Sequence, residues 1–460
     1  MPSFARYAAH LLAFAALFML SAQPAAAQSI LRDAETEALL ADMAAPLIAA
    51  AGLEPGNVDV VLVGDPSINA FVAGGQVVYI HSGLIDAADS ANEVQGVIAH
   101  ELGHITGGHI NRFEEGLGQA RNVTIASLIL GALAAAAGSG EAAMGAIMAG
   151  QQAAMGRFLA FNRVQETSAD AAGATYLSNA GITGRGSIEF FKKLENQEFR
   201  RGYSQDDSAT YGRSHPLSGD RISLLQQTYQ ADPAWDNTPD AELQERFLRA
   251  KAKLFGYLND PQTTQNRYPV SDTSVPARYA RAFAWHKAAL MDNALDEADA
   301  LIASDPSDPY FHELKGQVLL ESGKPDAALE SLRTATELTN NQPLIASLFG
   351  HALIATEDPD NLSEAERVLR AAVALDRRNP FAWYQLGVVY DARGDEPRAR
   401  LASAEQQVMR GQYFQALQSA MAAEAGLPAG SPDWLRAQDV ANEARVGFER
   451  QQENGGRSRR

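Results

Sequence analysis

The stretch SANEVQGVIAHELGHITGG, residues 90–108, predicts a buried helix from which the rest of the chain can be interpreted. Ser90 with Glu93 three residues later forms a capping box, a typical helix start. Gly107 and Gly108 are expected just after the helix end. We therefore expect one helix face to pack in a core. Its apolar residues recur at three- and four-residue spacing: Val94, Val97, Ile98, Leu102 and Ile105.

His100 and His104 lie four residues apart on this helix. Side chains at that spacing lie one above the other, so both imidazoles can reach one metal ion. Glu101 lies about a hundred degrees further round the helix, where it can accept a proton from an attacking water. The pattern is typical of zinc hydrolases. The alternative is a pair of structural histidines on an ordinary helix.

Two histidines do not complete a catalytic zinc site, which needs a third protein ligand. In one known pattern a third histidine follows ten residues after the first, but position 110 is Ile110 and His109 is off by one. The other source is a carboxylate from a later helix. Glu166 and Asp170 share a helix face and fit this role, with Glu166 on the metal and Asp170 accepting a hydrogen bond from a ligand histidine. The alternative is a solvated acidic face.

The composition limits which classes of protein are possible. At 460 residues the chain is expected to hold two or three domains. Its formal net charge of -18 makes it a poor partner for nucleic acid, whose phosphates would repel it. It has no cysteine, which excludes disulfides and leaves only histidine and carboxylate as metal ligands.

The first 27 residues have the pattern of a cleavable secretory signal. Arg6 precedes the apolar run 11–20, and alanines at 25–27 supply a small-residue cleavage pattern. The run is short for a membrane span, which favours cleavage after Ala27 over a retained anchor. We therefore expect an exported, periplasmic protein.

Residues 28–235 are expected to form a first domain. Residues 29–52 have the pattern of an amphipathic helix. Short β-branched runs at 58–64 and 76–81 predict two strands, the second after the turn residues Gly74-Gly75. The helix of the two histidines follows directly.

Two Ala/Gly-rich arms around Glu141, within residues 122–150, predict a helical hairpin. Neither arm reaches the roughly 20 apolar residues that a membrane span needs. We expect a flap or a buried hairpin, and membrane insertion is the disfavoured alternative.

The second half of the chain repeats itself. Seven residues after three successive prolines stand glycines, and the proline is expected to start each repeat. Small residues at fixed offsets let two helices cross closely, which is typical of tetratricopeptide repeats, although other helical-hairpin arrays share part of the pattern. The prolines are Pro276, Pro309, Pro343 and Pro380, and the glycines are Gly316, Gly350 and Gly387.

These patterns predict an α+β, mostly helical chain: a zincin-type domain with a small edge sheet, then an all-α repeat solenoid. We expect a connecting helix and linker at 236–274, the repeats at 275–450 and a disordered tail at 451–460.

The sequence resembles the HtpX and CAAX-prenyl-protease superfamily of zinc peptidases over roughly residues 30–230. It departs from that family at Ala73, where a proline usually precedes the paired glycines. Four patches carry the resemblance: Asn69-Ala70-Phe71 with Gly74-Gly75, the HExxH motif at His100, the ExxAD motif at Glu166, and Ser214-His215-Pro216 with Asp220-Arg221.

The resemblance implies one Zn²⁺ per chain, held by His100, His104 and Glu166, with Glu101 as general base. It places His215 beside the metal, either as an oxyanion donor or in the fourth ligand position of a resting state. Arg221 would be a structural or substrate-orienting partner. Substrate is expected to lie extended along the strand 76–80 by backbone pairing. The residues expected to contact it are Asn69, Phe71, Val77 and Val78.

Together with export and the repeats, the resemblance implies proteolytic quality control of outer-membrane proteins. Unfolded or misassembled proteins would be the substrates, and the repeats would contact clients or the outer-membrane assembly machinery. The alternative is a periplasmic chaperone or adaptor whose peptidase site is autoinhibited or vestigial.

Overall fold

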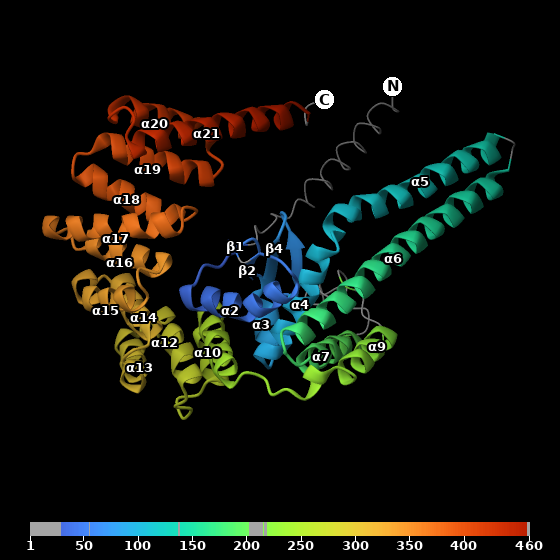
Figure 1. The fold of residues 1–460 in the computed structure, drawn as a ribbon, viewed down its shortest axis with the longest axis horizontal. Coiled ribbons are helices and arrows are strands. Elements are labelled where there is room, and N and C mark those ends of the chain that lie inside the picture. Colours follow the sequence, from blue (N-terminus) through green and yellow to red (C-terminus); the bar gives the residue numbers. More distant parts are fainter. Residues whose placement is uncertain (1–28, 55, 137–138, 202–214, 216–218, 458–460) are drawn as a thin grey trace, which may run out of the picture.

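The computed structural model describes residues 29–54, 56–136, 139–201, 215 and 219–457, so the predicted signal segment lies outside the described residues. Its first part is a small sheet covered by helices, and its second part is a stack of helix pairs (Figure 1). Helices of the first part are α2 (Ala34–Ala50), α3 (Ser82–Ala87), α4 (Ala91–Thr106), α5 (His109–Ala136), α6 (Gly140–Asn179), α7 (Arg185–Arg201), α9 (Gly219–Gln230) and the 3₁₀ turn η2 (Pro233–Asp236).

The sheet has four strands in the order β1-β2-β4-β3. The predicted runs become β2 (Asp59–Gly64) and β4 (Val77–His81), which pair in parallel. β3 (Ala70–Ala73) pairs antiparallel with β4, and β1 (Ser29–Ile30) pairs antiparallel with β2. β4 therefore lies inside the sheet, and β3 is an edge strand.

The helix predicted from residue 29 begins later. Ser29 and Ile30 belong to β1, and α2 starts at Ala34 because the side chain of Asp33 accepts the backbone N–H of Thr36 at 2.9 Å. The prediction was therefore wrong for the first residues of this helix, where a side-chain cap and a strand pairing outweigh the apolar pattern.

The core of the first part surrounds α4. Every residue from Ala91 to Gly103 is buried, because α4 contacts β3 and β4 as well as α2, α6 and α7. The predicted apolar stripe is present, but the helix is covered on all sides rather than on one face. Because neighbouring elements cover α4, the two histidines lie in a site that is largely shielded from bulk water.

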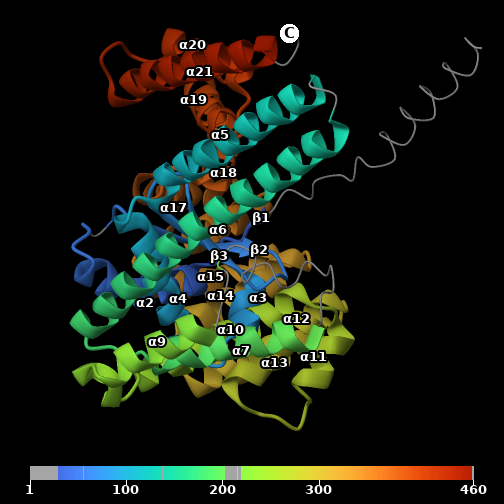
Figure 2. The ribbon, with the colours of Figure 1, turned by 90° about the vertical axis from the view of Figure 1, so that its right-hand side faces the viewer.

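The helices α5 and α6 form the predicted hairpin, which projects away from the rest of the molecule (Figures 1 and 2). Of the two forms expected for it, a flap or a buried hairpin, the buried form was wrong, because the arms extend beyond the body that could cover them. None of the helices in the described residues is long and apolar enough to cross a membrane. Large apolar side chains exposed on the hairpin include Ile125, Leu128, Ile129, Leu130, Leu133, Met144, Met148 and Met155.

The second half is a stack of antiparallel helix pairs, as the repeat pattern predicts (Figure 1). Added side chains at Gly316 and Gly350 would lie 2.4 and 2.5 Å from Leu332 and Leu369 of the paired helix, so close crossing requires glycine. The helices are α10 (Ala241–Leu258), α11 (Pro261–Arg267), α12 (Val275–Lys287), α13 (Met291–Ser304), α14 (Pro309–Glu321), α15 (Pro325–Leu338), α16 (Pro343–Ala355), η3 (Pro359–Asn361), α17 (Leu362–Leu375), α18 (Pro380–Ala392), α19 (Glu396–Met409), α20 (Tyr413–Gly426) and α21 (Pro432–Arg457).

The end of the chain differs from its prediction. α21 continues to Arg457, so residues 451–457 are helical rather than a disordered tail. The polar composition of this segment does not prevent a helix that has already started at Pro432, since propagation is easier than nucleation. Residues 458–460 lie outside the described residues.

A buried group of charged residues joins the two parts, and we call it the junction cluster. Glu35 of α2 pairs with Arg249 of α10 and accepts the hydroxyl of Tyr279 of α12 at 2.7 Å. Arg249 also pairs with Asp308, which caps α14, at 2.6 Å. The cluster thus ties α2, α10 and the first repeats together. Its members are Asp33, Glu35, Arg249, Lys253, Tyr279 and Asp308.

An Arg249→Ala variant is expected to lose about 3 kcal/mol or more of the free energy of unfolding, because Glu35 and Asp308 would each lose a close cationic partner. Denaturant unfolding measures the change. The matched control is Arg246→Ala on the same helix, whose pair with Asp42 is exposed and is expected to contribute about 1 kcal/mol at most. Equal losses in the two variants would contradict a structural role for the cluster.

Candidate metal centre

Helix α4 holds both histidines against α6. The Ser90 hydroxyl accepts the backbone N–H of Glu93 at 3.2 Å, so the predicted cap starts the helix. Gly103, between the two histidines, lets the helices approach. A Cβ at this position would lie 2.6 Å from the carbonyl oxygen of Ala169, which is sterically forbidden. The glycine inside the motif is therefore needed to bring α6 within reach of the histidines.

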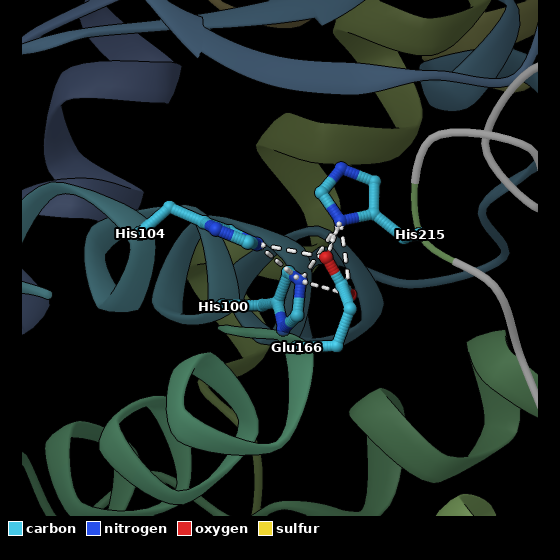
Figure 3. Close-up of side chains that lie close together, drawn as sticks. All are labelled: His100, His104, Glu166 and His215. Atoms are coloured by element: carbon cyan, nitrogen blue, oxygen red, sulfur yellow. Dashed lines mark hydrogen bonds and ion pairs between the residues drawn. The ribbon is translucent and has the colours of Figure 1, made fainter. Parts of the chain in front are cut away.

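Four side chains from α4, α6 and the segment at 215 converge on one point (Figure 3). Nε2 of His100 lies 3.1 Å from Nε2 of His104 and 3.2 Å from Nδ1 of His215. The carboxylate of Glu166 lies 3.4 Å from Nε2 of each of His100 and His104, and 3.0 Å from Nδ1 of His215. One ligand atom from each residue lies within 4.8 Å of all the others.

This geometry fits a divalent metal ion. Two ligand nitrogens, each about 2.05 Å from zinc in a tetrahedral arrangement, lie roughly 3.3 Å apart. The observed separations of 3.1 to 3.4 Å match that spacing. Imidazole and carboxylate donors suit zinc, although manganese, cobalt and iron accept similar sets. The residues present can therefore hold one ion without rearrangement.

The charges of the site also favour a cation. Burial acts to lower the pKa of His100, but hydrogen bonds to Asp170 and Glu166 raise it to about 10. Burial and the positive charges at His100 and His215 lower the pKa of His104 to about 2. The pKa of Glu166 is lowered, because these histidines outweigh its burial. The carboxylates thus hold positive charge between the ligands, and a metal ion supplies that charge.

Asp170 and Arg221 bond the converging side chains, and the contact of Asp170 with a histidine is the one that the sequence predicted. Nδ1 of His100 donates to Asp170 at 2.9 Å, which leaves Nε2 of that ring free to face the metal position. Arg221, on α9, bonds both Asp170 and, at 3.0 Å, Glu166. The resemblance left two roles open for Arg221, and its position between two buried carboxylates favours the structural one.

Glu101 lies buried at the edge of this group, with 1% of its surface exposed. Its two carboxylate oxygens make no hydrogen bond with any group in the described part of the chain. Burial raises the pKa of this carboxyl, although His215 and His100 act in the opposite direction. Nε2 of His215 lies 3.5 Å from one of its oxygens. A buried carboxylate with unused acceptor capacity is suited to accept a proton from water.

A cavity of about 310 Å³ opens onto Glu101 and the metal ligands. Phe71 and Val72 of the edge strand β3 form one wall, and the beginning of α5 with the middle of α6 forms the other. Phe71 stacks on Tyr79 with ring centroids 5.0 Å apart, which fixes its place. The cavity therefore joins the metal position to a strand edge.

The prediction that substrate pairs with strand 76–80 was wrong. β4 is bonded to β2 on one side and to β3 on the other, so its backbone has no free edge. Val78 is fully buried, and Val77 pairs with Ala73. Asn69 is buried just before β3, where its carbonyl accepts the N–H of His81. Of the four predicted substrate contacts, Phe71 lines the cavity.

His109 is the contact that the sequence did not reveal. Its Nδ1 lies 3.0 Å from Nδ1 of His104, on the side of the ring away from the metal position. It stands at the start of α5, where the chain turns back after Gly107 and Gly108. The spacing of His109 from His100 excluded it as a metal ligand. That spacing also does not predict a contact with the ring nitrogen of His104 that faces away from the metal position.

The chain is similar to several known proteins. Residues 31–229 match the model of Peptidase family M48. The Beta-barrel assembly-enhancing protease of Yersinia pestis is 25% identical over 383 residues, 82% of this chain and 76% of that protein. Metalloprotease LoiP of Escherichia coli (strain K12) is 29% identical over 182 residues, 39% of this chain and 65% of that protein. The solved structure of YrrB, a TPR protein, covers 38% of this chain and 91% of its own at 20% identity and a TM-score of 0.31.

The matched region contains the whole group of metal ligands together with Glu101 and Arg221. The repeats lie after it, in the order that the sequence predicts. Residues 31–229 match Peptidase family M48, and the chain is a metalloprotease whose second part is a stack of helix pairs.

Proposed function

We propose that this chain is an exported zinc endopeptidase that cleaves unfolded or misassembled envelope proteins. The observation that carries the proposal is the buried carboxylate of Glu101, with no hydrogen-bond partner in the described residues, beside four converging side chains. The test is hydrolysis of an unfolded protein by the purified chain. Cleavage that stops on chelation and returns with zinc is expected, and cleavage unaffected by chelation would contradict the proposal.

Each residue of the site has a separate role in peptide hydrolysis. A metal ion held by His100, His104 and Glu166 would polarise the scissile carbonyl and lower the pKa of water at the site. Glu101 takes the proton of the attacking water and delivers it to the leaving amine. Asp170 holds His100 in one tautomer during this exchange.

We infer that His215 closes the site in a resting state. Its Nδ1 lies among the ligand atoms, 3.0 Å from Glu166 and 3.2 Å from Nε2 of His100. Catalytic zinc sites keep one position open, whereas four protein ligands make a closed site. This position supports the resting-state role for His215, so the residue must leave before substrate enters.

A His215→Ala variant is therefore expected to cleave a short unstructured peptide several-fold faster than the wild type. It is also expected to hold its metal more weakly, because one donor is lost. The measurement is kcat/KM on the peptide, with metal content determined on the same samples. A lower kcat at full metal content would instead assign His215 as an oxyanion donor.

No strand of the described residues pairs with the outer edge of β3, and this edge supports substrate binding by strand addition. His81 N–H bonds the carbonyl of Asn69, and Ala70 faces Ile80 in the antiparallel register. Because bonded and non-bonded pairs alternate, the backbone groups of Ala70 and Val72 point away from β4. Val72 also lines the cavity at the metal position. An extended peptide paired here would pass the metal position, whatever its side chains are.

A Val72→Pro variant removes one edge donor without removing a β4 bond. We expect kcat/KM on an unfolded protein to fall roughly 3- to 10-fold. Val72→Ala, which keeps the N–H, is the matched control and separates the lost donor from the lost side chain. If the alanine variant loses as much activity as the proline variant, substrate does not pair with this edge.

The relatives suggest the client class. One carries the printed name Beta-barrel assembly-enhancing protease, and it aligns with both parts of this chain. We propose that this chain acts in the periplasm on outer-membrane β-barrel proteins that fail to assemble, and that its repeats bind clients or the assembly machinery. The test offers one β-barrel protein in unfolded and in folded form. Equal cleavage of the two would contradict quality control.

A chaperone or adaptor function is the second candidate, and the closed arrangement around His215 favours it. The two functions differ in one observable. An adaptor would suppress aggregation of an unfolded β-barrel protein without cleaving it. Cleavage that depends on Glu101 excludes a purely binding role.

A further inference from the structure

A second cavity lies between the peptidase part and the repeats. It has a volume of about 440 Å³ and is distinct from the cavity at the metal position. One wall is the segment Ile30–Ala34 with the end of α10, and the opposite wall is the first helix of three repeats, α14, α16 and α18. Ala34 packs there against Ala335 and Ile345, so the two parts are in direct contact beside the cavity.

Glu313, on α14, lines this cavity and is incompletely bonded. Its Oε2 is buried and makes no hydrogen bond with the described residues. A buried carboxylate oxygen without a donor is unfavourable, so buried charges are normally paired. Lys253 also lines the cavity, but its ammonium already bonds Asp33 at 2.5 Å and Glu35 at 3.3 Å. Arg32 is likewise held by Glu37 and Asp376.

The groups around Glu313 include more carboxylates than cationic side chains. Burial and the carboxylates of the junction cluster raise the pKa of Glu313 to about 8, against the lowering effect of Lys253. An added cation would balance this excess. With Glu313 the cluster has four carboxylates and two cations: Asp33, Glu35, Asp308 and Glu313 against Arg249 and Lys253.

Much of the remaining lining is apolar, although Gln317, Ser347 and Asn379 also line the cavity. Leu344 and Leu348 of α16 and Phe283 of α12 line it, and the aromatic rings of Tyr257 and Phe381 are 49% and 42% exposed at its border. A basic side chain has an apolar stem and a charged end, which matches an apolar cavity that ends at a carboxylate. Exposed aromatic rings add a surface that attracts cations. The volume exceeds that of one side chain, so neighbouring residues can also enter.

We propose that this cavity binds a lysine or arginine side chain of an extended client peptide, with the carboxylate of Glu313 pairing with its charge. The inference rests on the proposed function, because it names what the repeats capture. It places a client between the repeats and the peptidase part. A chain held there would keep its remaining length near the metal centre while it is cleaved.

The test measures binding to the full chain carrying Glu101→Gln, so that no peptide is cleaved. The probes are two fluorescent, unstructured peptides that differ at one central position, lysine in one and norleucine in the other, between leucine and alanine residues. Fluorescence anisotropy is expected to show about tenfold tighter binding of the lysine peptide. Equal affinity for the two peptides would overturn the proposal.

Three further variants identify the carboxylate. Glu313→Gln is expected to abolish the lysine preference, whereas Glu330→Gln, an exposed residue of α15 outside the cavity, is expected to keep it. Gln317→Lys places a cation one helical turn from Glu313 in the same cavity and is expected to weaken binding of the lysine peptide. A lysine preference that survives in both Glu313→Gln and Gln317→Lys would overturn the assignment.

A pH series gives an independent readout. Lysine stays protonated below about pH 10, so the preference is expected to grow from about pH 6.5 to 9 as Glu313 ionises, and to be flat in Glu313→Gln. Hydrolysis by the wild type is measured in a separate assay. If the wild type cleaves no substrate but the lysine preference is retained, the peptidase function is refuted and the proposed lysine-binding cavity still stands. The titratable groups that interact electrostatically with Glu313 are Asp33, Glu35, Lys253, Tyr279, Asp308 and Tyr310.

Discussion

Replacing Glu101 with glutamine is expected to lower kcat/KM for hydrolysis of an unfolded protein roughly 10²- to 10⁴-fold. Glutamine keeps the shape of the side chain but cannot take the proton of an attacking water. The metal ligands are untouched, so metal content and thermal stability should match the wild type. Burial raises the pKa of this carboxyl, and the amide removes a buried charge rather than adding one.

The matched control is Glu189→Gln, a change of the same kind at an exposed position of α7. It should retain full activity. If Glu101→Gln hydrolyses substrate as fast as the control, Glu101 is not the general base, and the peptidase mechanism proposed for this site is wrong.

Replacing Glu166 with alanine is expected to weaken metal binding by more than the roughly 10- to 100-fold that the loss of an outer-shell partner causes. The change removes the carboxylate that lies within 3.4 Å of both ligand histidines. Competition with a chelator of known affinity measures the effect, and circular dichroism checks the fold. Retained affinity would mean that the carboxylate ligand comes from elsewhere, with Asp170 the nearest candidate.

The convergence of the candidate ligands could be predicted from the sequence, because local spacing decides most of it. Helical periodicity places His100 and His104 on one face, and the same rule brings Glu166 and Asp170 together. The order of these motifs in the family that the sequence resembles then indicated that the two helices lie side by side. The repeats were equally readable, because each one must place a small residue where its helices cross, as at Gly316 and Gly350.

Features that depend on long-range packing could not be predicted. The short run at 70–73 has no distinctive pattern, yet its pairing with β4 makes it the edge strand and moves the expected substrate contact away from Val77 and Val78. His109 reaches His104 only because the chain reverses after α4. The hairpin is charge-poor in the sequence, and only its projection beyond the body shows that its apolar residues are exposed.

The junction cluster is a further case of this kind. Glu35, Arg249 and Tyr279 are separated by up to 244 residues and carry no motif. Because exposed acidic residues are common in this sequence, the charges of these residues do not indicate a buried cluster. Their contact depends on how the first repeats pack on α2 and α10, and that packing also creates the cavity at Glu313.

The metal content of the purified full chain tests the central claim most directly. Mass spectrometry of the protein after gentle purification is expected to find about one zinc ion per chain, and the same ion in Glu101→Gln. A chain that carries no divalent metal and takes up none from a zinc buffer would contradict the account, because His100, His104, Glu166 and His215 would then be a cluster without the ion that their geometry fits.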